Sequence, residues 1–102
     1  MVARAPAPAA KFQLGQLVAT PGAIRAMQEA GIEPRDLISR HLRGDWGDLC
    51  EDDKRLNDEA IKDGSRIFSA YKFGGVKFWV ITEAADDSGV RAATTILLPE
   101  EY

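Results

Sequence analysis

Apolar residues at intervals of three and four predict two short amphipathic helices in the first half of the chain. The first should start after Thr20, whose hydroxyl suits an N-cap, and stop at Gly31, which suits a left-handed C-cap. The second should run from Pro34 to Gly44. Their apolar faces consist of Ala23, Ile24, Met27 and Ala30 in the first helix, and Leu37, Ile38, His41 and Leu42 in the second.

A third helix is predicted from about Leu49 to Asp63. Asp48 fits its N-cap with Glu51 three residues on, an arrangement that resembles a capping box, and acids in a first turn complement the helix dipole. Only a narrow stripe around Leu56 and Ala60 is apolar. We therefore expect this helix to lie on the surface, with most of its circumference in water.

Beyond Arg66 the pattern changes to β-branched and aromatic residues, which favour strands. Strands are predicted over residues 66–73, 76–83 and 91–98, with a tight hairpin at Gly74 and Gly75 and a longer loop before the last strand. An earlier segment, residues 12–19, reads as extended, with Leu17 and Val18 as its expected buried residues.

These elements predict an α+β fold with a short N-terminal extended segment, three helices, and then a three-stranded antiparallel β-meander. Residues 1–11 read as a flexible Ala/Pro tail, and residues 12–102 as a single domain. The middle strand carries apolar side chains on both faces, so we expect the helices to pack on one face and the other face to be covered only in part. Whether Phe68, Phe78 or Trp79 forms a homodimer contact on that second face is left open.

Composition narrows the class of protein. A chain of 102 residues that is 45% hydrophobic suits one globular domain. The single cysteine, Cys50, excludes an intrachain disulfide, and no apolar run approaches the roughly 20 residues that cross a bilayer. We expect a cytoplasmic protein that does not associate with membranes.

Charge is distributed unevenly along the chain. The net charge is −3, but residues 1–44 hold six basic and three acidic groups, whereas residues 45–63 hold three basic and eight acidic groups. Direct nucleic-acid binding usually needs a net basic surface. The acidic middle of the chain therefore argues against it.

Few residues offer catalytic or metal-binding chemistry. His41 is the only histidine, and we expect it to be buried with a ring nitrogen bonded to backbone or to the loop of Trp46. Cys50 precedes three acids and is expected to be a partly buried, inert thiol. No spacing matches a zinc or calcium motif. The sequence thus predicts no metal, no cofactor and no enzymatic activity, although a deep cleft beside Asp48 and His41 would support an enzyme with a carboxylate site.

The segment around Trp46 is the main candidate site. This tryptophan either pins its loop to the core or serves as an aromatic anchor inside a charged rim, as in binding hot spots. The acids around it are either an ordinary solvated helix face or a surface aimed at a basic partner. The predicted partner-binding set is Asp45, Trp46, Asp48, Glu51, Asp52, Asp53, Asp58 and Glu59.

Several stretches, "ATPGA", "RHLRGDWGDL", "SAY", "WVITEA" and "TTILLPEEY", resemble a family of small uncharacterised proteins from bacterial plasmids, prophages and other mobile elements. The resemblance covers residues 14–102 and departs from the family at "EAADDSGVRAATT", which is longer than usual. It implies a protein that binds host machinery, and inhibitors of CRISPR or restriction systems are a prominent class among such proteins.

The leading hypothesis is therefore a non-enzymatic binding protein, of the anti-CRISPR or anti-restriction kind, whose acidic surface meets a host protein with a basic site, such as a nucleic-acid-binding component of a defence system. One alternative is a DNA-associated regulatory factor that uses the basic N-terminal third. Its candidate residues are Arg25, Arg35, Arg40 and Arg43. Another alternative is a housekeeping protein of unknown function.

Overall fold

The computed structural model describes residues 10–102, so most of the predicted Ala/Pro tail lies outside the described residues. Two residues of the predicted tail, 10 and 11, are described, and the Lys11 N–H donates to the Leu42 carbonyl at 3.0 Å. The elements are β1 (Gln16–Ala19), α1 (Pro21–Ala30), α2 (Pro34–Leu42), α3 (Glu51–Asp63), β2 (Ile67–Phe73), β3 (Val76–Thr82), β4 (Ala93–Leu97) and the 3-10 turn η1 (Pro99–Glu101).

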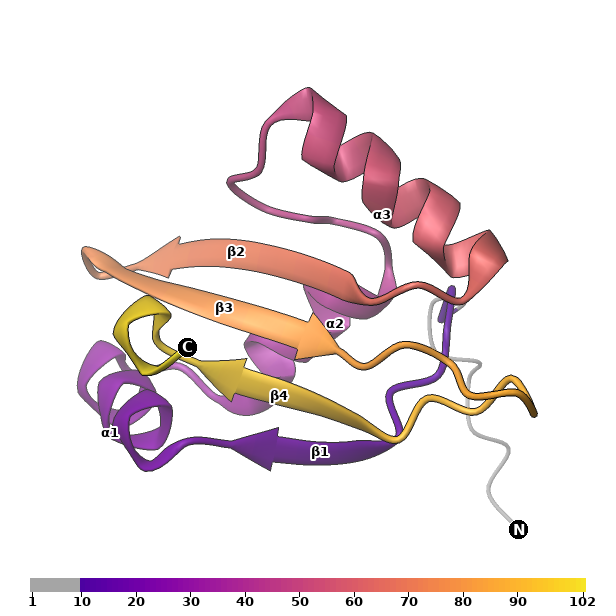
Figure 1. Cartoon of the computed structure of the whole chain (residues 1–102). Coiled ribbons are helices and arrows are strands. Elements are labelled where there is room, and N and C mark those ends of the chain that lie inside the picture. The colour runs from indigo at the N-terminus through magenta and orange to yellow at the C-terminus, as the bar shows by residue number, and fades with distance from the viewer. Residues whose placement is uncertain (1–9) are drawn as a thin grey trace, which may run out of the picture.

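The strands form one mixed sheet in the order β1-β4-β3-β2 (Figure 1). The predicted antiparallel meander of β2, β3 and β4 is confirmed, and Phe73 pairs with Val76 across the Gly74–Gly75 turn. The strand count was wrong, because the N-terminal extended segment joins the sheet as a fourth strand, parallel to β4. Pairing partners so far apart in the sequence leave no local pattern that predicts them.

Two helices cover one face of the sheet. Figure 1 shows α2 behind the strands, and the main core is formed by Ala23, Ala26 and Met27 of α1, Leu37 and Ile38 of α2, and Tyr71, Phe78, Val80 and Ile96 of the sheet. The predicted caps of α1 are confirmed: Thr20 Oγ1 accepts the Ala23 amide at 3.1 Å, and Gly31 is left-handed with φ of 70°. Ile24 was wrongly placed in the core, because its side chain is 44% exposed.

Helix α3 lies beyond the β2 edge of the sheet (Figure 1) and covers a smaller cluster of Trp46, Ala60 and Ile67. As predicted, most of its surface is exposed, but Leu56 was wrongly given to its apolar stripe. The capping box was also wrong, since the helix starts at Glu51 with Cys50 at the N-cap and no side-chain cap bond. Cys50 itself is exposed, not partly buried.

The β2 edge of the sheet is closed by side-chain and loop contacts. The Asn57 side-chain amide donates to the Phe68 carbonyl at 2.6 Å and accepts the Phe68 N–H at 3.1 Å. Two residues further along β2, the Ala70 N–H donates to the Trp46 carbonyl at 3.2 Å, and the Asp48 N–H donates to the Ala70 carbonyl at 2.7 Å. The backbone groups that an edge strand leaves free are therefore satisfied within the chain along this part of β2.

The close approach of the Trp46 loop to β2 explains why one residue of the "GDWGDL" segment is a glycine. Gly47 has a φ of 74°, and a Cβ on it would lie 1.9 Å from the Ala70 carbonyl oxygen. Any larger residue would push the loop off β2, so only glycine fits here.

The other end of the sheet is less covered than the sequence indicated. Leu17 and Val18 were predicted to be buried, yet they are 46% and 40% exposed. The reason is that β1 is an edge strand, with a neighbour on one side only.

Asn57→Ala should lower the free energy of unfolding by about 1–3 kcal/mol, because it leaves two partly buried backbone groups of Phe68 without partners. Urea unfolding measures this change. Leu56→Ala on the same helix is the matched control and should change stability by less than about 0.5 kcal/mol, since that side chain is exposed. Equal losses in the two variants would show that Asn57 does not support the β2 edge.

Candidate functional site

Trp46 faces the core and not the solvent. Its side chain is 4% exposed, and its Nε1–H donates to Asp58 Oδ1 at 3.1 Å. The indole stacks on Phe12, with ring centroids 6.1 Å apart, and meets His41 edge-on at 5.9 Å. Of the two readings of the sequence, the structure therefore supports the one in which Trp46 pins its loop to the fold.

Asp45 is held inside the same loop. Its carboxylate accepts the Arg40 Nε–H at 2.7 Å and the Gly47 amide at 3.2 Å, and its carbonyl accepts the Tyr71 hydroxyl at 2.7 Å. The hydrogen bond from Arg40 lowers the pKa of this carboxyl below its usual value. Asp45 thus orders the turn that follows α2, and its charge is largely matched.

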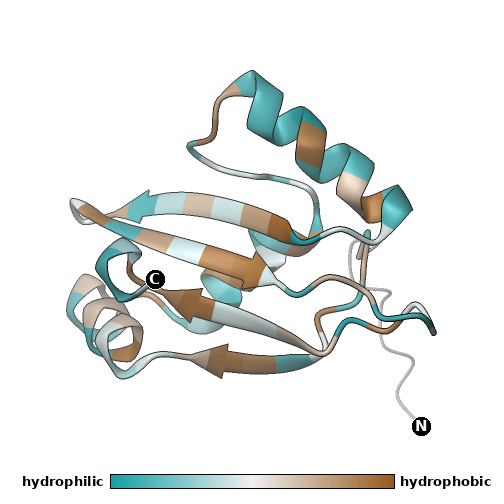
Figure 2. Ribbon diagram, in the orientation of Figure 1, coloured by the Kyte–Doolittle hydropathy of each residue, from teal (hydrophilic) through white to brown (hydrophobic). Residues whose placement is uncertain are grey.

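The remaining predicted acids are exposed side chains of α3 and of the loop before it, which we together call the acidic α3 surface: Asp48, Glu51, Asp52, Asp53, Asp58 and Glu59. Figure 2 shows that α3 is mostly hydrophilic. Glu51 lies 3.7 Å from Lys54, and Asp52 lies 3.5 Å from Arg55, in exposed ion pairs that water screens. Within residues 10–102, Asp53 and Glu59 belong to no ion pair.

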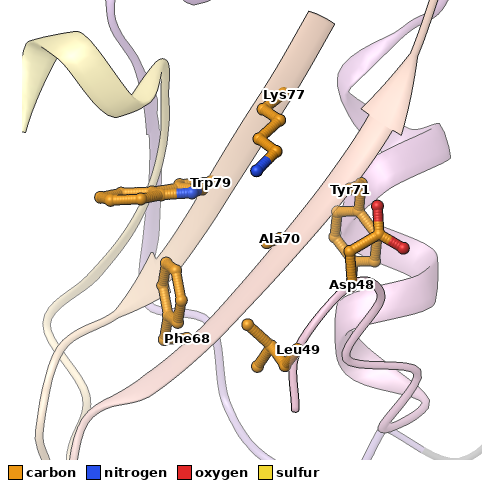
Figure 3. A pocket seen from close by; sticks show the side chains of 7 residues that line it. All are labelled: Asp48, Leu49, Phe68, Ala70, Tyr71, Lys77 and Trp79. Atoms are coloured by element: carbon orange, nitrogen blue, oxygen red, sulfur yellow. The ribbon is translucent and has the colours of Figure 1, made fainter. Parts of the chain in front are cut away.

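A shallow groove starts beside this surface. It has a volume of about 200 Å³ and runs between the loop at Asp48 and the sheet face that α1 and α2 leave open. Figure 3 shows the Phe68 and Trp79 rings on one side of the groove and Asp48 on the other. The two rings meet edge-to-face at 5.0 Å, and Trp79 meets Tyr102 in the same way at 5.6 Å. Phe78, the third aromatic predicted for this face, is fully buried on the opposite one.

His41 is buried, as predicted, but its partners are two hydroxyl groups and not backbone or the Trp46 loop. Its side chain is fully buried, with Nδ1 2.5 Å from Ser69 Oγ and Nε2 2.9 Å from Thr82 Oγ1. Because His41 is buried and the groove beside Asp48 is shallow, the two residues do not share a cleft.

The direction of the bonds around His41 follows from counting protons. Thr94 Oγ1 donates to the Leu14 carbonyl at 2.7 Å, so it accepts from Thr82 at 2.7 Å. Thr82 has then used its only proton and must accept from His41, which places the ring proton on Nε2. Ser69 consequently donates to Nδ1. This buried chain of hydrogen bonds fits a neutral imidazole and has no place for a second ring proton.

Burial, and secondly the charge of Arg91, lower the pKa of His41 to about 3.

Arg91 is a structurally important residue that the sequence did not reveal. It is 5% exposed, and its guanidinium donates to the carbonyls of Ala60, Ser65 and Glu83 at 2.8–3.0 Å. An arginine in a loop next to alanines gives no local signal of this role, which depends on three distant carbonyls.

The basic residues of the N-terminal third are partly engaged. Arg35 lies 2.8 Å from Glu33, and Arg40 pairs with Asp45 and lies 4.5 Å above the Tyr71 ring. Arg25 and Arg43 are exposed. The four arginines therefore do not present four free charges to a phosphate backbone.

Neither metal-binding nor membrane-spanning features are found in the described part of the chain. Among residues 10–102 no three histidine, cysteine or acidic side chains lie close enough to hold a metal ion. None of the helices there has the length and apolar character that crossing a membrane requires. No family model, curated protein or solved structure matches this chain.

The imidazole of His41 should stay neutral at pH values far below the usual histidine pKa. The unfolded chain binds a proton near pH 6.5 and the folded chain only near 3, so the stability from neutral His41 is complete above about pH 6.5 and is lost as the pH falls toward 3. Between about pH 7 and about pH 5 this one group should lower the free energy of unfolding by about 2 kcal/mol.

Because His41 is the only histidine, its imidazole NMR signals are unambiguous. They should show the Nε2–H tautomer and no titration down to about pH 4. A titration midpoint near 6.5 would contradict the buried hydrogen-bond chain.

Proposed function

We propose that this chain is a non-enzymatic binding protein that engages a basic partner protein through the acidic α3 surface. One observation carries the proposal: Leu56, an apolar residue of α3, is 60% exposed. It lies three residues after Asp53 and three before Glu59, which places all three side chains on one helical face. An exposed apolar side chain flanked by charge has the composition of a binding hot spot.

The charges of this surface suit a protein partner with a basic site. Lys54 and Arg55 offset Glu51 and Asp52 only weakly because these pairs are exposed, so the surface keeps a net negative field. Such a field steers a basic partner during encounter, while burial of Leu56 would supply affinity. The proposed binding residues are the acidic α3 surface and Leu56, with Trp46 and Asp45 holding the preceding loop in place.

The resemblance to mobile-element proteins supports a more specific partner. A nucleic-acid-binding component of a bacterial defence system has a basic groove, and carboxylates spaced along a helix can occupy it in place of phosphates. Under this proposal the chain is an anti-CRISPR or anti-restriction inhibitor that acts in the cytoplasm.

Charge reversal on α3 should abolish partner binding. In a pull-down from host lysate with quantitative mass spectrometry, Asp52→Lys with Asp53→Lys should lose the protein that the wild type captures. Leu56→Ala should weaken binding of that purified partner about tenfold. Affinity should also fall steeply between about 0.1 M and about 1 M salt, as the Debye length drops from about 10 to about 3 Å.

The matched control is Glu29→Lys with Asp87→Lys, which makes the same charge change at exposed acids outside α3. This control should capture the partner as the wild type does, and circular dichroism should show all variants folded. The same capture by every variant, with no salt dependence, would rule out the acidic α3 surface as the binding site.

A further inference from the structure

The sheet face opposite to α1 and α2, which we call the open face, presents aromatic rings to solvent. It is turned toward the viewer in Figure 1. Tyr71 and Phe78 point into the core, so alternation along β2 and β3 places Phe68 and Trp79 on the open face. Both of these rings are partly exposed, and the exposed Tyr102 packs against Trp79. Aromatic rings that remain partly exposed on a sheet are surfaces on which other flat rings can stack.

Two lysines face each other at one end of the open face. Lys72 of β2 is the cross-strand partner of Lys77 of β3, close to the hairpin turn. Both side chains are exposed, and among residues 10–102 neither belongs to an ion pair. Like charges directly opposite each other in a sheet are destabilising. An anionic ligand at this position would therefore compensate a repulsion that the described acids leave in place.

A third cation lies at the other end of the open face. Arg66 precedes Lys72 by six residues, which is about 20 Å along an extended chain. It is exposed, its Nη1 donates to the Tyr102 hydroxyl at 2.9 Å, and its guanidinium lies 5.8 Å from the Tyr102 ring. Within the described residues no acid forms an ion pair with it. The aromatic rings thus lie between positive charges at both ends.

Two grooves on the open face are each lined by both the Phe68 and the Trp79 ring. They have volumes of about 200 and about 220 Å³. Figure 3 shows the Lys77 amine directed into the first groove, and Arg66 lines the second. Of the described residues that line the grooves, Asp48 is the one acid. A carboxylate repels phosphates but accepts hydrogen bonds from the amino group of a base, so this groove suits bases better than phosphates.

We propose that the open face binds a single-stranded nucleic acid, with bases stacked on Phe68 and Trp79 and with phosphates held by Lys72, Lys77 and Arg66. Cations at both ends of a row of aromatic rings match a chain in which charge and flat rings alternate. A duplex keeps its bases inside and cannot use the rings. Most of the acids that argue against nucleic-acid binding lie on α3, beyond the β2 edge and not on the open face (Figure 1).

Fluorescence anisotropy with labelled oligo-dC and oligo-rC of about ten nucleotides tests the stacking. Binding of either one to the wild type supports the proposal, and the tighter one identifies the sugar of the ligand. Trp79→Leu keeps apolar bulk without the ring and should bind at least about tenfold more weakly, whereas Trp79→Phe should stay within about threefold. Binding should also quench the fluorescence of Trp79, because Trp46, the other tryptophan, is buried.

Salt dependence tests the phosphate contacts. Three contacts predict a slope of log K against log salt of about −2, and Lys72→Gln with Lys77→Gln should reduce it to about −0.7. This variant should not be less stable, because it removes a like-charge pair. The matched control is Arg25→Gln with Arg43→Gln, which removes the same charge from exposed arginines outside the open face and should bind as the wild type does. The assay contains no partner protein, so its result is independent of the acidic α3 surface.

Four results would overturn the proposal. A wild type that binds neither oligonucleotide at about 50 mM salt has no such site. Equal affinity for a duplex of the same length, or for polyglutamate, would show that charge acts without stacking. Unchanged affinity in Trp79→Leu would show that no base stacks on this ring. Loss of binding in the arginine control, with the lysine variant unaffected, would place the site in the basic N-terminal third.

Discussion

The buried chain of hydrogen bonds through His41 is the constraint on which the rest of the structure depends. It connects α2 to β2 through Ser69, to β3 through Thr82, and onward through Thr94 of β4 to the Leu14 carbonyl. Each buried polar atom has a partner only when these elements are all in register. The same hydrogen bonds determine the tautomer of the His41 ring. They also hold the end of α2 at the place where Arg40, Asp45 and Trp46 organise the next loop.

Helix α3 is attached to this framework mainly by polar side chains. Asn57 bonds to β2, Trp46 reaches Asp58, and Arg91 binds the Ala60 carbonyl near the end of the helix. Its apolar contact is limited to a small cluster. These contacts close the sheet edge beneath the helix, and the acids of α3 and Leu56 remain exposed.

The two edges of the sheet differ in what covers them. At one end the edge is closed and the covering helix offers charge around an apolar residue. At the other, a short strand without charge or proline leaves its backbone groups free.

Local chemistry in the sequence determined the helices, the caps of α1, the Gly74–Gly75 hairpin and the three meander strands, because each depends on residues a few positions apart. It also identified His41 as buried and the acids of α3 as exposed. Only the tertiary structure decided that β1 pairs with β4, that Trp46 points inward, that Leu56 is exposed, and that Arg91 and Asn57 hold α3. These features depend on groups far apart in the sequence, and the burial of a side chain is settled by what packs against it.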